Sequence, residues 1–237
     1  MATLVLLRHG QSRWNLENRF TGWVDVDLSE QGEAEASRAG ALIANAGLVF
    51  DRCFASVQTR AIRTGWIALA ACDQAWIPMA KSWRLNERHY GALTGLDKAD
   101  TAARYGAEQV KIWRRSYDIA PPPLPQGGPY DLGGDRRYKG VTVPATESLR
   151  TTLERVMPYW LDEIAPVLNT GETVLVAAHG NSLRAIAKHL FGLSESGVVG
   201  LEIPTGNPLA IALDADLAPR SAAYLDPKRA QPLPMPG

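Results

Sequence analysis

Two short apolar segments, far apart in the chain, each end in a His-Gly pair. Residues 3–7 continue into Arg8-His9-Gly10, and residues 173–178 continue into His179-Gly180. Apolar runs of this length predict buried strands of an α/β sheet. Ligands of such sheets bind outside the carboxyl ends of the strands. If the two strands are neighbours, both histidines converge on one pocket, where glycine lets an anion approach the backbone.

The second His-Gly pair changes how the first is interpreted. A histidine at a strand end is more often a structural hydrogen-bonding group than a nucleophile, although neutral imidazole can be one. A helix predicted to begin near Ser182 would point free N–H groups at the same place, which suits an anion. Of the other histidines, His189 lies mid-helix and is expected to be structural and partly exposed. The residues alone leave His89 unassigned.

Arginines supply a second indication of an anion site. Arg8 adjoins His9, and Arg60 and Arg63 begin the helix that follows the second predicted strand. The guanidinium group matches phosphate oxygens in a bidentate way. A solvated surface charge is the simpler interpretation of most arginines, but the strand–helix junction makes Arg60 a candidate phosphate ligand.

Apolar runs and helical periodicity alternate along the rest of the chain. We expect further strands in residues 51–57, 75–79 and 209–213, and helices in residues 29–46, 58–71, 97–105, 107–117, 146–164 and 182–191. This order predicts an α/β fold with three layers, a mostly parallel sheet with helices on both faces, in a single domain over residues 1–237. The proline- and glycine-rich residues 119–145 are expected to form a lid-like loop, and residues 219–237 a loose tail.

Composition excludes several classes of partner. Lysine plus arginine and aspartate plus glutamate number 25 each, so the formally neutral chain is not expected to bind nucleic acid or a membrane surface. Cys53 and Cys72 lie in apolar surroundings without metal-ligand spacing, which favours a reducing compartment. With no signal-peptide pattern and no apolar run of about 18 residues, we expect a cytoplasmic protein without a metal.

The chain resembles the histidine phosphatase superfamily, and within it the phosphoglycerate mutases that depend on 2,3-bisphosphoglycerate. Arg-His-Gly alone indicates only the superfamily. The mutase branch is indicated by FTGW, NERHYGALTG and the paired Arg114-Arg115. The resemblance is carried by LLRHGQSRWNLENRFTGWVDVDLSEQG, SVQTRAIRTGW, KSWRLNERHYGALTGLDKADTAARYG, WRRSYDIAPPPL, VPATESL, AAHGNSLRAI and IPTGNPL.

This resemblance implies roles for individual residues. His9 resembles the nucleophile that becomes phosphohistidine, and Glu87 the general acid and base for the substrate hydroxyl. The groups around the transferred phosphoryl group would be Arg8, Arg60 and His179, assisted by Asn15 and Gly180. Those that contact the substrate carboxylate and second phosphate would be Tyr90, Lys98, Arg114 and Arg115. Further binding positions would be Thr21, Gly22, Arg88, His89 and Asn181.

The reaction implied is the interconversion of 3-phosphoglycerate and 2-phosphoglycerate, with 2,3-bisphosphoglycerate as phosphoryl primer and no metal. The family commonly forms homo-oligomers, either dimers or tetramers. Two alternatives remain open. One is a phosphatase of the same fold acting on small phosphate esters. The other is a phospho-ligand-binding module without catalysis, which would be expected to lack the nucleophile or an arginine, and none is missing.

Four departures from the family pattern are visible. Gln11 stands where many members have glutamate, and Asn207 replaces a usual apolar residue. The loop at residues 131–140 diverges. Many members end in a longer Lys/Ala-rich tail thought to help close the site, whereas Asp226 and the residues after it form a short proline-rich segment. The resemblance therefore leaves open whether the tail of this chain helps to close the site.

Overall fold

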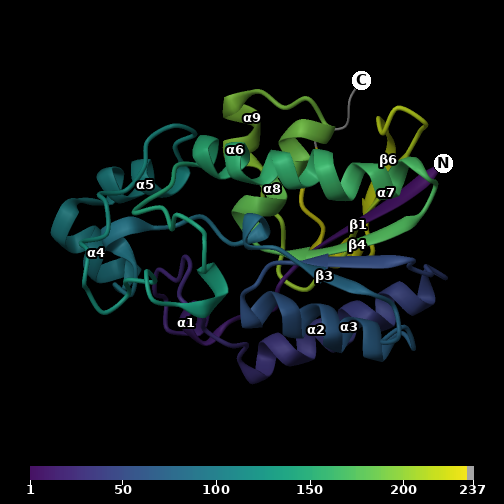
Figure 1. The fold of residues 1–237 in the computed structure, drawn as a ribbon, viewed down its shortest axis with the longest axis horizontal. Helices are drawn as coiled ribbons and strands as arrows, with labels where there is room; N and C mark the ends of the chain where they lie inside the picture. Colours follow the sequence, from purple (N-terminus) through teal and green to yellow (C-terminus); the bar gives the residue numbers. More distant parts are fainter. Residues whose placement is uncertain (234–237) are drawn as a thin grey trace.

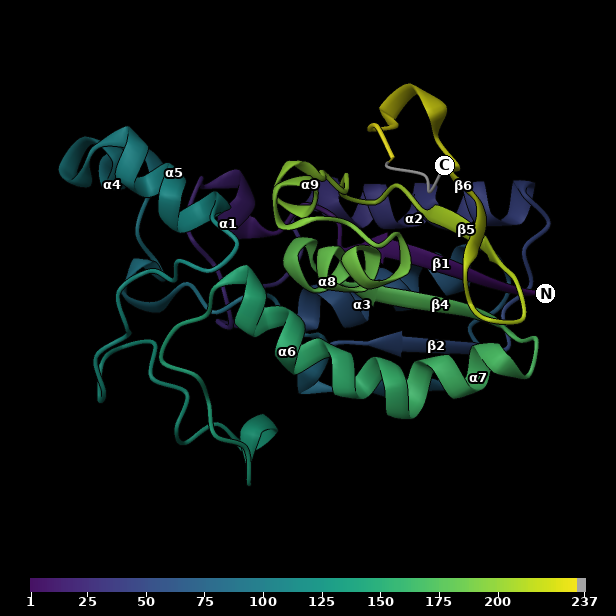
Figure 2. The same ribbon diagram turned by 90° about the horizontal axis from the view of Figure 1, so that it is seen from above.

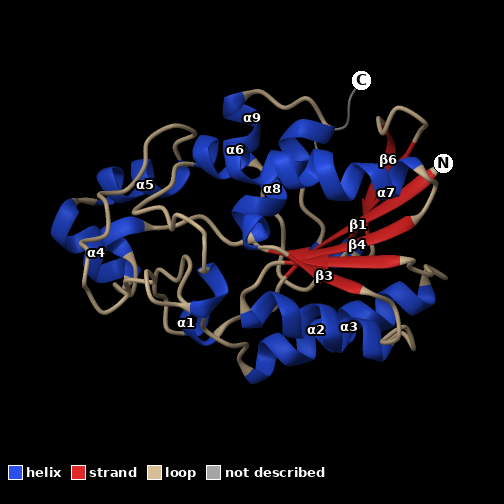
Figure 3. Ribbon diagram, viewed as in Figure 1, coloured by secondary structure: helices blue, strands red, loops and turns tan. Residues whose placement is uncertain are grey.

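Six strands form one mixed sheet in the computed structural model, which describes residues 1–233 (Figures 1 and 3). The strand order is β3-β2-β4-β1-β5-β6. β1 (Ala2–Arg8) pairs in parallel with β4 (Thr173–Ala178) and antiparallel with β5 (Leu209–Leu213). β2 (Arg52–Ala55) and β3 (Met79–Lys81) extend the parallel part, and β6 (Pro219–Tyr224) pairs antiparallel with β5. The mostly parallel sheet predicted from the sequence is confirmed.

Helices cover both faces of this sheet (Figures 1 and 2). One face carries α2 (Glu30–Asn45) and α3 (Thr59–Ala71). The other carries α6 (Leu149–Tyr159), a π-helical turn (Trp160–Ile164), α7 (Ala165–Asn169) and α8 (Gly180–Leu190). Side chains alternate along β1, so Leu4 and Leu6 join the core under α6–α8 whereas Val5 and Leu7 join the core under α2 and α3. The predicted three layers are confirmed.

The remaining elements connect these layers. They are α1 (Arg13–Leu16), α4 (Lys98–Tyr105), α5 (Ala107–Arg115), α9 (Glu195–Gly200) and 3₁₀ turns at Trp83–Leu85, Gly91–Leu93, Arg136–Tyr138 and Pro227–Arg229. We call α4 and α5 the outer helices, because they lie beyond the carboxyl ends of the parallel strands, at the left of Figure 1. Across residues 1–233, no helix combines the length and the apolar character needed to cross a membrane.

Helix starts follow local side-chain chemistry, and two differ from those predicted. Ser29 and Asp97 accept hydrogen bonds from the first turns of α2 and α4, as expected. The predicted start at Thr146 is wrong: Ser148 is the N-cap of α6, because the Thr146 hydroxyl donates to the carbonyl of Pro121 at 2.8 Å. α8 begins at Gly180 rather than Ser182, with His179 at the N-cap position.

Two other predicted boundaries are shifted. β3 begins at Met79 rather than residue 75, because residues 75–77 form a turn and Pro78, which has no N–H, contributes only a carbonyl that accepts from the Cys53 N–H at 3.0 Å. α5 ends at Arg115, two residues early, because Ser116 has an extended backbone with ψ 150°.

The prediction of a loose tail from residue 219 is wrong for the residues that the structure describes. β6 pairs with β5 along its length. After it, Asn207 donates through Nδ2 to the Asp226 carbonyl and accepts from the Asp226 N–H, both at 3.0 Å. Arg229 donates to the Thr205 carbonyl at 2.8 Å. The unusual Asn207 therefore fixes the end of β6 to the loop before β5. Residues 234–237 lie outside the described part.

Candidate active site

The two His-Gly segments meet at one edge of the sheet. Arg8 pairs with Ala178 in the β1–β4 register, and the His9 N–H donates to the Ala178 carbonyl at 3.0 Å. The imidazole rings of His9 and His179 therefore lie with centroids 4.9 Å apart and planes at 61°. The predicted convergence of the two histidines is confirmed.

The two glycines serve packing in different ways. A Cβ on Gly10 would lie 2.2 Å from the carbonyl oxygen of Gly32 in α2, so the backbones of these two residues touch. Gly10 is thus needed for close packing of β1 on α2 rather than for the approach of an anion. A Cβ on Gly180 would lie 3.5 Å from the guanidinium of Arg8, so this glycine faces the cations of the site.

One ring nitrogen of His9 is hydrogen-bonded, and the other has no hydrogen-bond partner in residues 1–233. Its Nδ1 lies 2.6 Å from the carbonyl oxygen of Gly10, and a carbonyl can only accept, so Nδ1 carries the hydrogen and Nε2 the lone pair. Burial lowers the pKa of His9 well below its usual value, and the charges of Arg60 and Arg8 lower it further. His9 is therefore a neutral imidazole with its nucleophilic nitrogen available.

His179 lies behind His9 and is completely buried. Its Nε2 is 2.7 Å from the Ser56 hydroxyl, which also accepts from the Gln58 N–H. Its Nδ1 is buried without a partner among the described residues. Burial lowers the pKa of His179 well below the usual value, and the charge of Arg60 lowers it further. This leaves a neutral ring with one polar atom that the described residues do not satisfy.

Arg8 and Arg60 are held by backbone carbonyls rather than by carboxylates. Arg8 donates to the Ile203 carbonyl at 2.9 Å, and Arg60 donates to the carbonyls of Val24 at 3.0 Å and Gly22 at 2.8 Å. Burial lowers the pKa of Arg60 to about 10, so it stays charged at neutral pH. The Nε atoms of both arginines are buried without partners in residues 1–233. Such uncompensated cations fit an anion.

Glu87 is fixed through one of its two carboxylate oxygens. The hydrogen bonds that described residues donate to it all end on Oε1: from the Arg88 N–H at 2.7 Å, and from the Asn181 side chain and N–H at 2.8 and 3.3 Å. Arg155 in turn donates to the Glu87 carbonyl at 3.2 Å and forms a buried ion pair with Glu147. Glu87 Oε2 thus keeps its lone pairs for a ligand.

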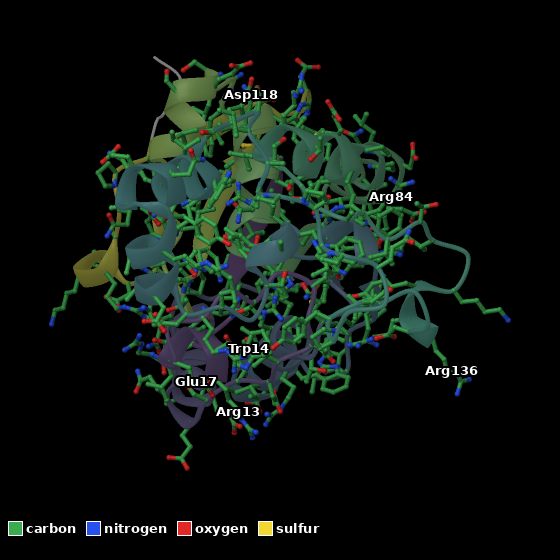
Figure 4. The ribbon with its side chains drawn as sticks, turned by 90° about the vertical axis from the view of Figure 1, so that its left-hand side faces the viewer. Arg13, Trp14, Glu17, Arg84, Asp118 and Arg136 are labelled. Atoms are coloured by element: carbon green, nitrogen blue, oxygen red, sulfur yellow. The ribbon has the colours of Figure 1, made fainter. Side chains whose placement is uncertain are left out.

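These groups surround a small cavity of about 130 Å³. Figure 4 looks onto this end of the molecule, with Asp118 near the top and Trp14 below the middle. Thirteen of the predicted site residues line the cavity: Arg8, His9, Asn15, Thr21, Gly22, Arg60, Glu87, Tyr90, Lys98, Arg114, Arg115, Gly180 and Asn181.

Three predicted residues lie outside the cavity wall. His179 is directly behind His9. Arg88 is buried and donates to the Arg114 carbonyl at 2.9 Å, so it stabilises the last turn of α5. The Nδ1 of His89 accepts from the Gly91 N–H at 3.0 Å, and burial lowers its pKa to about 4. The structure therefore does not bring His89 to the site.

Sequence reasoning missed four residues of the wall: Arg19, Phe20, Arg184 and Glu202. Arg184 could have been found, because it lies three residues after Asn181 on the same face of α8. Arg19 stacks on the Trp14 ring, with its Cζ 3.9 Å from the centroid, and nothing in the local sequence predicts that contact. In residues 1–233, no three metal-ligating His, Cys, Asp or Glu side chains gather at one point.

Residues 4–216 match the model of the histidine phosphatase superfamily, branch 1. The chain belongs to the histidine phosphatase superfamily. A 2,3-bisphosphoglycerate-dependent phosphoglycerate mutase of Caulobacter vibrioides is 67% identical over 237 residues, which is 100% of both chains. Another from Hyphomonas neptunium is 59% identical over 234 residues, 99% of each chain. The resemblance seen in the sequence is thus confirmed.

Two solved structures of phosphatases share the fold. A mycobacterial glucosyl-3-phosphoglycerate phosphatase with VO3 aligns with a TM-score of 0.69 at 23% identity, covering 90% of this chain and 93% of that one. A putative alpha-ribazole-5'-P phosphatase from Escherichia coli aligns with a TM-score of 0.68 at 20% identity, covering 94% of each chain. At these identities the likeness concerns the fold alone.

Proposed function

We infer that this protein interconverts 3-phosphoglycerate and 2-phosphoglycerate as a mutase that depends on 2,3-bisphosphoglycerate. The observation that carries the inference is the neutral His9, with Nδ1 bonded to the Gly10 carbonyl, beside Arg8 and Arg60. Both arginines donate to backbone carbonyls and form no ion pair with a carboxylate within residues 1–233. Relatives that match nearly the whole chain at 57–67% identity carry the same name. The phosphatase alternative has no comparable support from close relatives.

His9 and Glu87 would divide the chemistry. His9 Nε2 attacks phosphorus in line, an N–P bond forms, and the P–O bond to the leaving hydroxyl oxygen breaks. That oxygen needs a proton, which we assign to the Glu87 carboxyl group. In the opposite direction Glu87 Oε2 takes the proton from a substrate hydroxyl as its oxygen attacks the phosphohistidine. Arg8 and Arg60 stabilise the charge on the transferred phosphoryl oxygens throughout.

The primer 2,3-bisphosphoglycerate would supply hydrogen-bond partners for buried polar atoms at the cavity that have none among the described residues. Within residues 1–233, the buried side-chain atoms without partners include Arg8 Nε, Arg60 Nε, Thr21 Oγ1 and His179 Nδ1. The first three belong to residues of the cavity wall. When bound, 2,3-bisphosphoglycerate supplies the phosphoryl group that charges His9 before turnover. We assign one phosphate to Arg8 and Arg60. The other acidic groups are assigned to Lys98, Arg114 and Arg115 on the outer helices.

Residues 119–145 are proposed to act as the lid that keeps water from the phosphohistidine. This segment reaches the cavity wall through Tyr130, whose hydroxyl accepts from Arg19 at 3.2 Å. Its first residues are fixed near Tyr90, because the Ala92 N–H donates to the Pro122 carbonyl at 2.7 Å. A lid with this function predicts that Tyr130→Phe raises phosphate release relative to isomerisation.

The deciding experiment joins phosphorylation to isomerisation. The protein is incubated with 2,3-bisphosphoglycerate, the acid-labile phosphohistidine is mapped, and 3-phosphoglycerate conversion is assayed without added metal. We expect phosphate on His9 and formation of 2-phosphoglycerate. Phosphate release that far exceeds isomerisation would replace the mutase with the phosphatase. Cytoplasmic location and assembly into a dimer or tetramer remain predictions, and sedimentation of the purified protein tests the second.

A further inference from the structure

Glu202 is a carboxylate in the wall of a cavity that otherwise attracts anions. It lies in the loop between α9 and β5, and its Oε1 is 2.6 Å from an Nη of Arg115. Its Oε2 is 3.3 Å from an Nη of Arg184. The other carboxylate of the wall, Glu87, has a part in proton transfer. Glu202 has none, so its presence beside two arginines needs a separate explanation.

The two arginines differ in how much they depend on Glu202. Arg184 is 10% exposed and is also held by the Leu201 carbonyl at 2.6 Å and the Asn181 side chain at 3.4 Å. Arg115 is 38% exposed, at the end of α5, and its ion pair among the described residues is the one with Glu202. Glu202 itself is 42% exposed. The Arg115–Glu202 pair therefore sits at the rim, where water and a ligand can replace either partner.

We propose that Glu202 is a specificity-determining residue that occupies Arg115 until the second acidic group of a phosphoglycerate displaces it. The substrate class in this proposal rests on the proposed function. Because the carboxylate of Glu202 and the acidic group of the ligand compete for one guanidinium, Glu202 lowers the affinity for ligands with two acidic groups. A ligand with a single phosphate, bound at Arg8 and Arg60, does not meet this competition.

Binding affinities of Glu202→Gln test the proposal. Calorimetric titration of the unphosphorylated protein compares 3-phosphoglycerate with inorganic phosphate. The variant is expected to bind 3-phosphoglycerate about two- to fivefold more tightly, the range of a partly exposed ion pair, and inorganic phosphate unchanged. In steady-state assays KM should fall with kcat unchanged. The matched control is Glu172→Gln, which removes the partner of Arg52 on the surface and should change neither affinity.

A double variant at Glu202 and Arg115 tests whether Glu202 competes with the ligand for Arg115 or only positions Arg115. In an Arg115→Met background, Glu202→Gln should give no further change in affinity for 3-phosphoglycerate. Unchanged or weaker binding by the Glu202→Gln single variant would overturn the proposal, because it would make Glu202 a support that positions Arg115. If the wild-type protein binds 3-phosphoglycerate without isomerising it, only the proposed function is lost. If neither form binds it, both are lost.

Discussion

The cavity has two halves that hold their cations in different ways. In the half built on the sheet, Arg8 and Arg60 donate to backbone carbonyls; Arg60 is buried and Arg8 is partly buried. In the half built on α5 and the chain before α2, Arg115 and Arg19 are partly exposed and pair with Glu202 and Glu17. In the described residues, the two arginines of the sheet half form no ion pair, whereas Arg115 and Arg19 of the outer half each form one.

This difference indicates that the sheet half serves phosphoryl transfer and the outer half serves substrate binding. Backbone carbonyls fix a guanidinium without cancelling its charge, so the sheet half is ready for the charge of a transferred phosphoryl group without reorganisation. Carboxylate partners can be exchanged for ligand groups, so the outer half is suited to recognition. Variants in the sheet half should therefore affect kcat, and variants in the outer half KM. The predictions below test this division.

His9→Asn should have the largest effect. The variant loses the nitrogen that forms the N–P bond, so we expect isomerisation to fall by at least about 10⁴-fold and no acid-labile phosphoenzyme to form. Phosphoenzyme trapping with 2,3-bisphosphoglycerate measures this directly. If the His9→Asn variant still forms the phosphoenzyme, another residue is the nucleophile. The assignment of the chemistry to the sheet half would then be wrong.

Arg60→Met should lower kcat about 10²- to 10³-fold, because it removes a fixed cation from the transferred phosphoryl group. Steady-state kinetics with 3-phosphoglycerate measures the effect. Arg63→Met is the matched control: Arg63 lies one turn later in α3, is 31% exposed and pairs with Asp27 and Glu33. A control variant with an equal loss of kcat would show that the sheet half has no special role.

Stability should fall as pH falls through about 6.5. The folded-state pKa values of His9 and His179 lie well below the usual 6.5, so below that pH the unfolded chain binds more protons than the folded one. Below pH 6.5, each of the two histidines lowers the free energy of unfolding by about 1.4 kcal/mol for each pH unit. Above pH 6.5 both contributions to stability are fully present. Denaturant unfolding at pH 7.5, 6 and 5 measures the slope.

The His9→Asn variant provides the control for this titration. Its slope below pH 6.5 should be smaller than that of the wild type by about 1.4 kcal/mol per pH unit, because one titrating group is removed. Equal slopes for the two proteins would mean that His9 becomes protonated in the folded state, and that the sheet half does not keep it neutral.

Arg115→Met should have the smallest effect of the series, on binding alone. We expect KM for 3-phosphoglycerate to rise about 10-fold and kcat to change by less than about twofold, as for a contact equally strong in the ground and transition states. Initial rates over a range of substrate concentrations separate the two constants. A fall in kcat comparable to that of Arg60→Met would contradict the division between the halves.

The parts of the fold that local patterns encode were predictable. β1, β4 and β5 are apolar runs, and α2 and α4 begin at capping side chains, so their chemistry is visible within a few residues. β6 was missed because PRSAAY has no apolar alternation of its own. Its pairing depends on the turn around Asp214, which accepts from the N–H groups of Asp216 and Ala218.

The residues of the site also divide into those that local sequence predicts and those that it does not. The sheet half was found because His9 and His179 follow strands, and the position of a strand end is a local property. Glu202 was missed because its role depends on Arg115, which lies 87 residues earlier and meets it only in the folded chain. His89 was misplaced because Glu87 and Tyr90, close to it in sequence, line the cavity, whereas the His89 ring packs near Trp23 with ring centroids 6.0 Å apart.

The central position of β1 in the sheet determines when this strand gains its partners as the chain is synthesised. Both hydrogen-bonding neighbours of β1 come from residues after 172, although β1 itself is made first. The nascent chain therefore carries its nucleophile on a strand with no partner until roughly three quarters of it has been made. Such long-range pairing folds slowly and leaves strand edges open. Catalytic competence should consequently arise late and in a single step, and fragments ending before β4 should be inactive and dependent on chaperones.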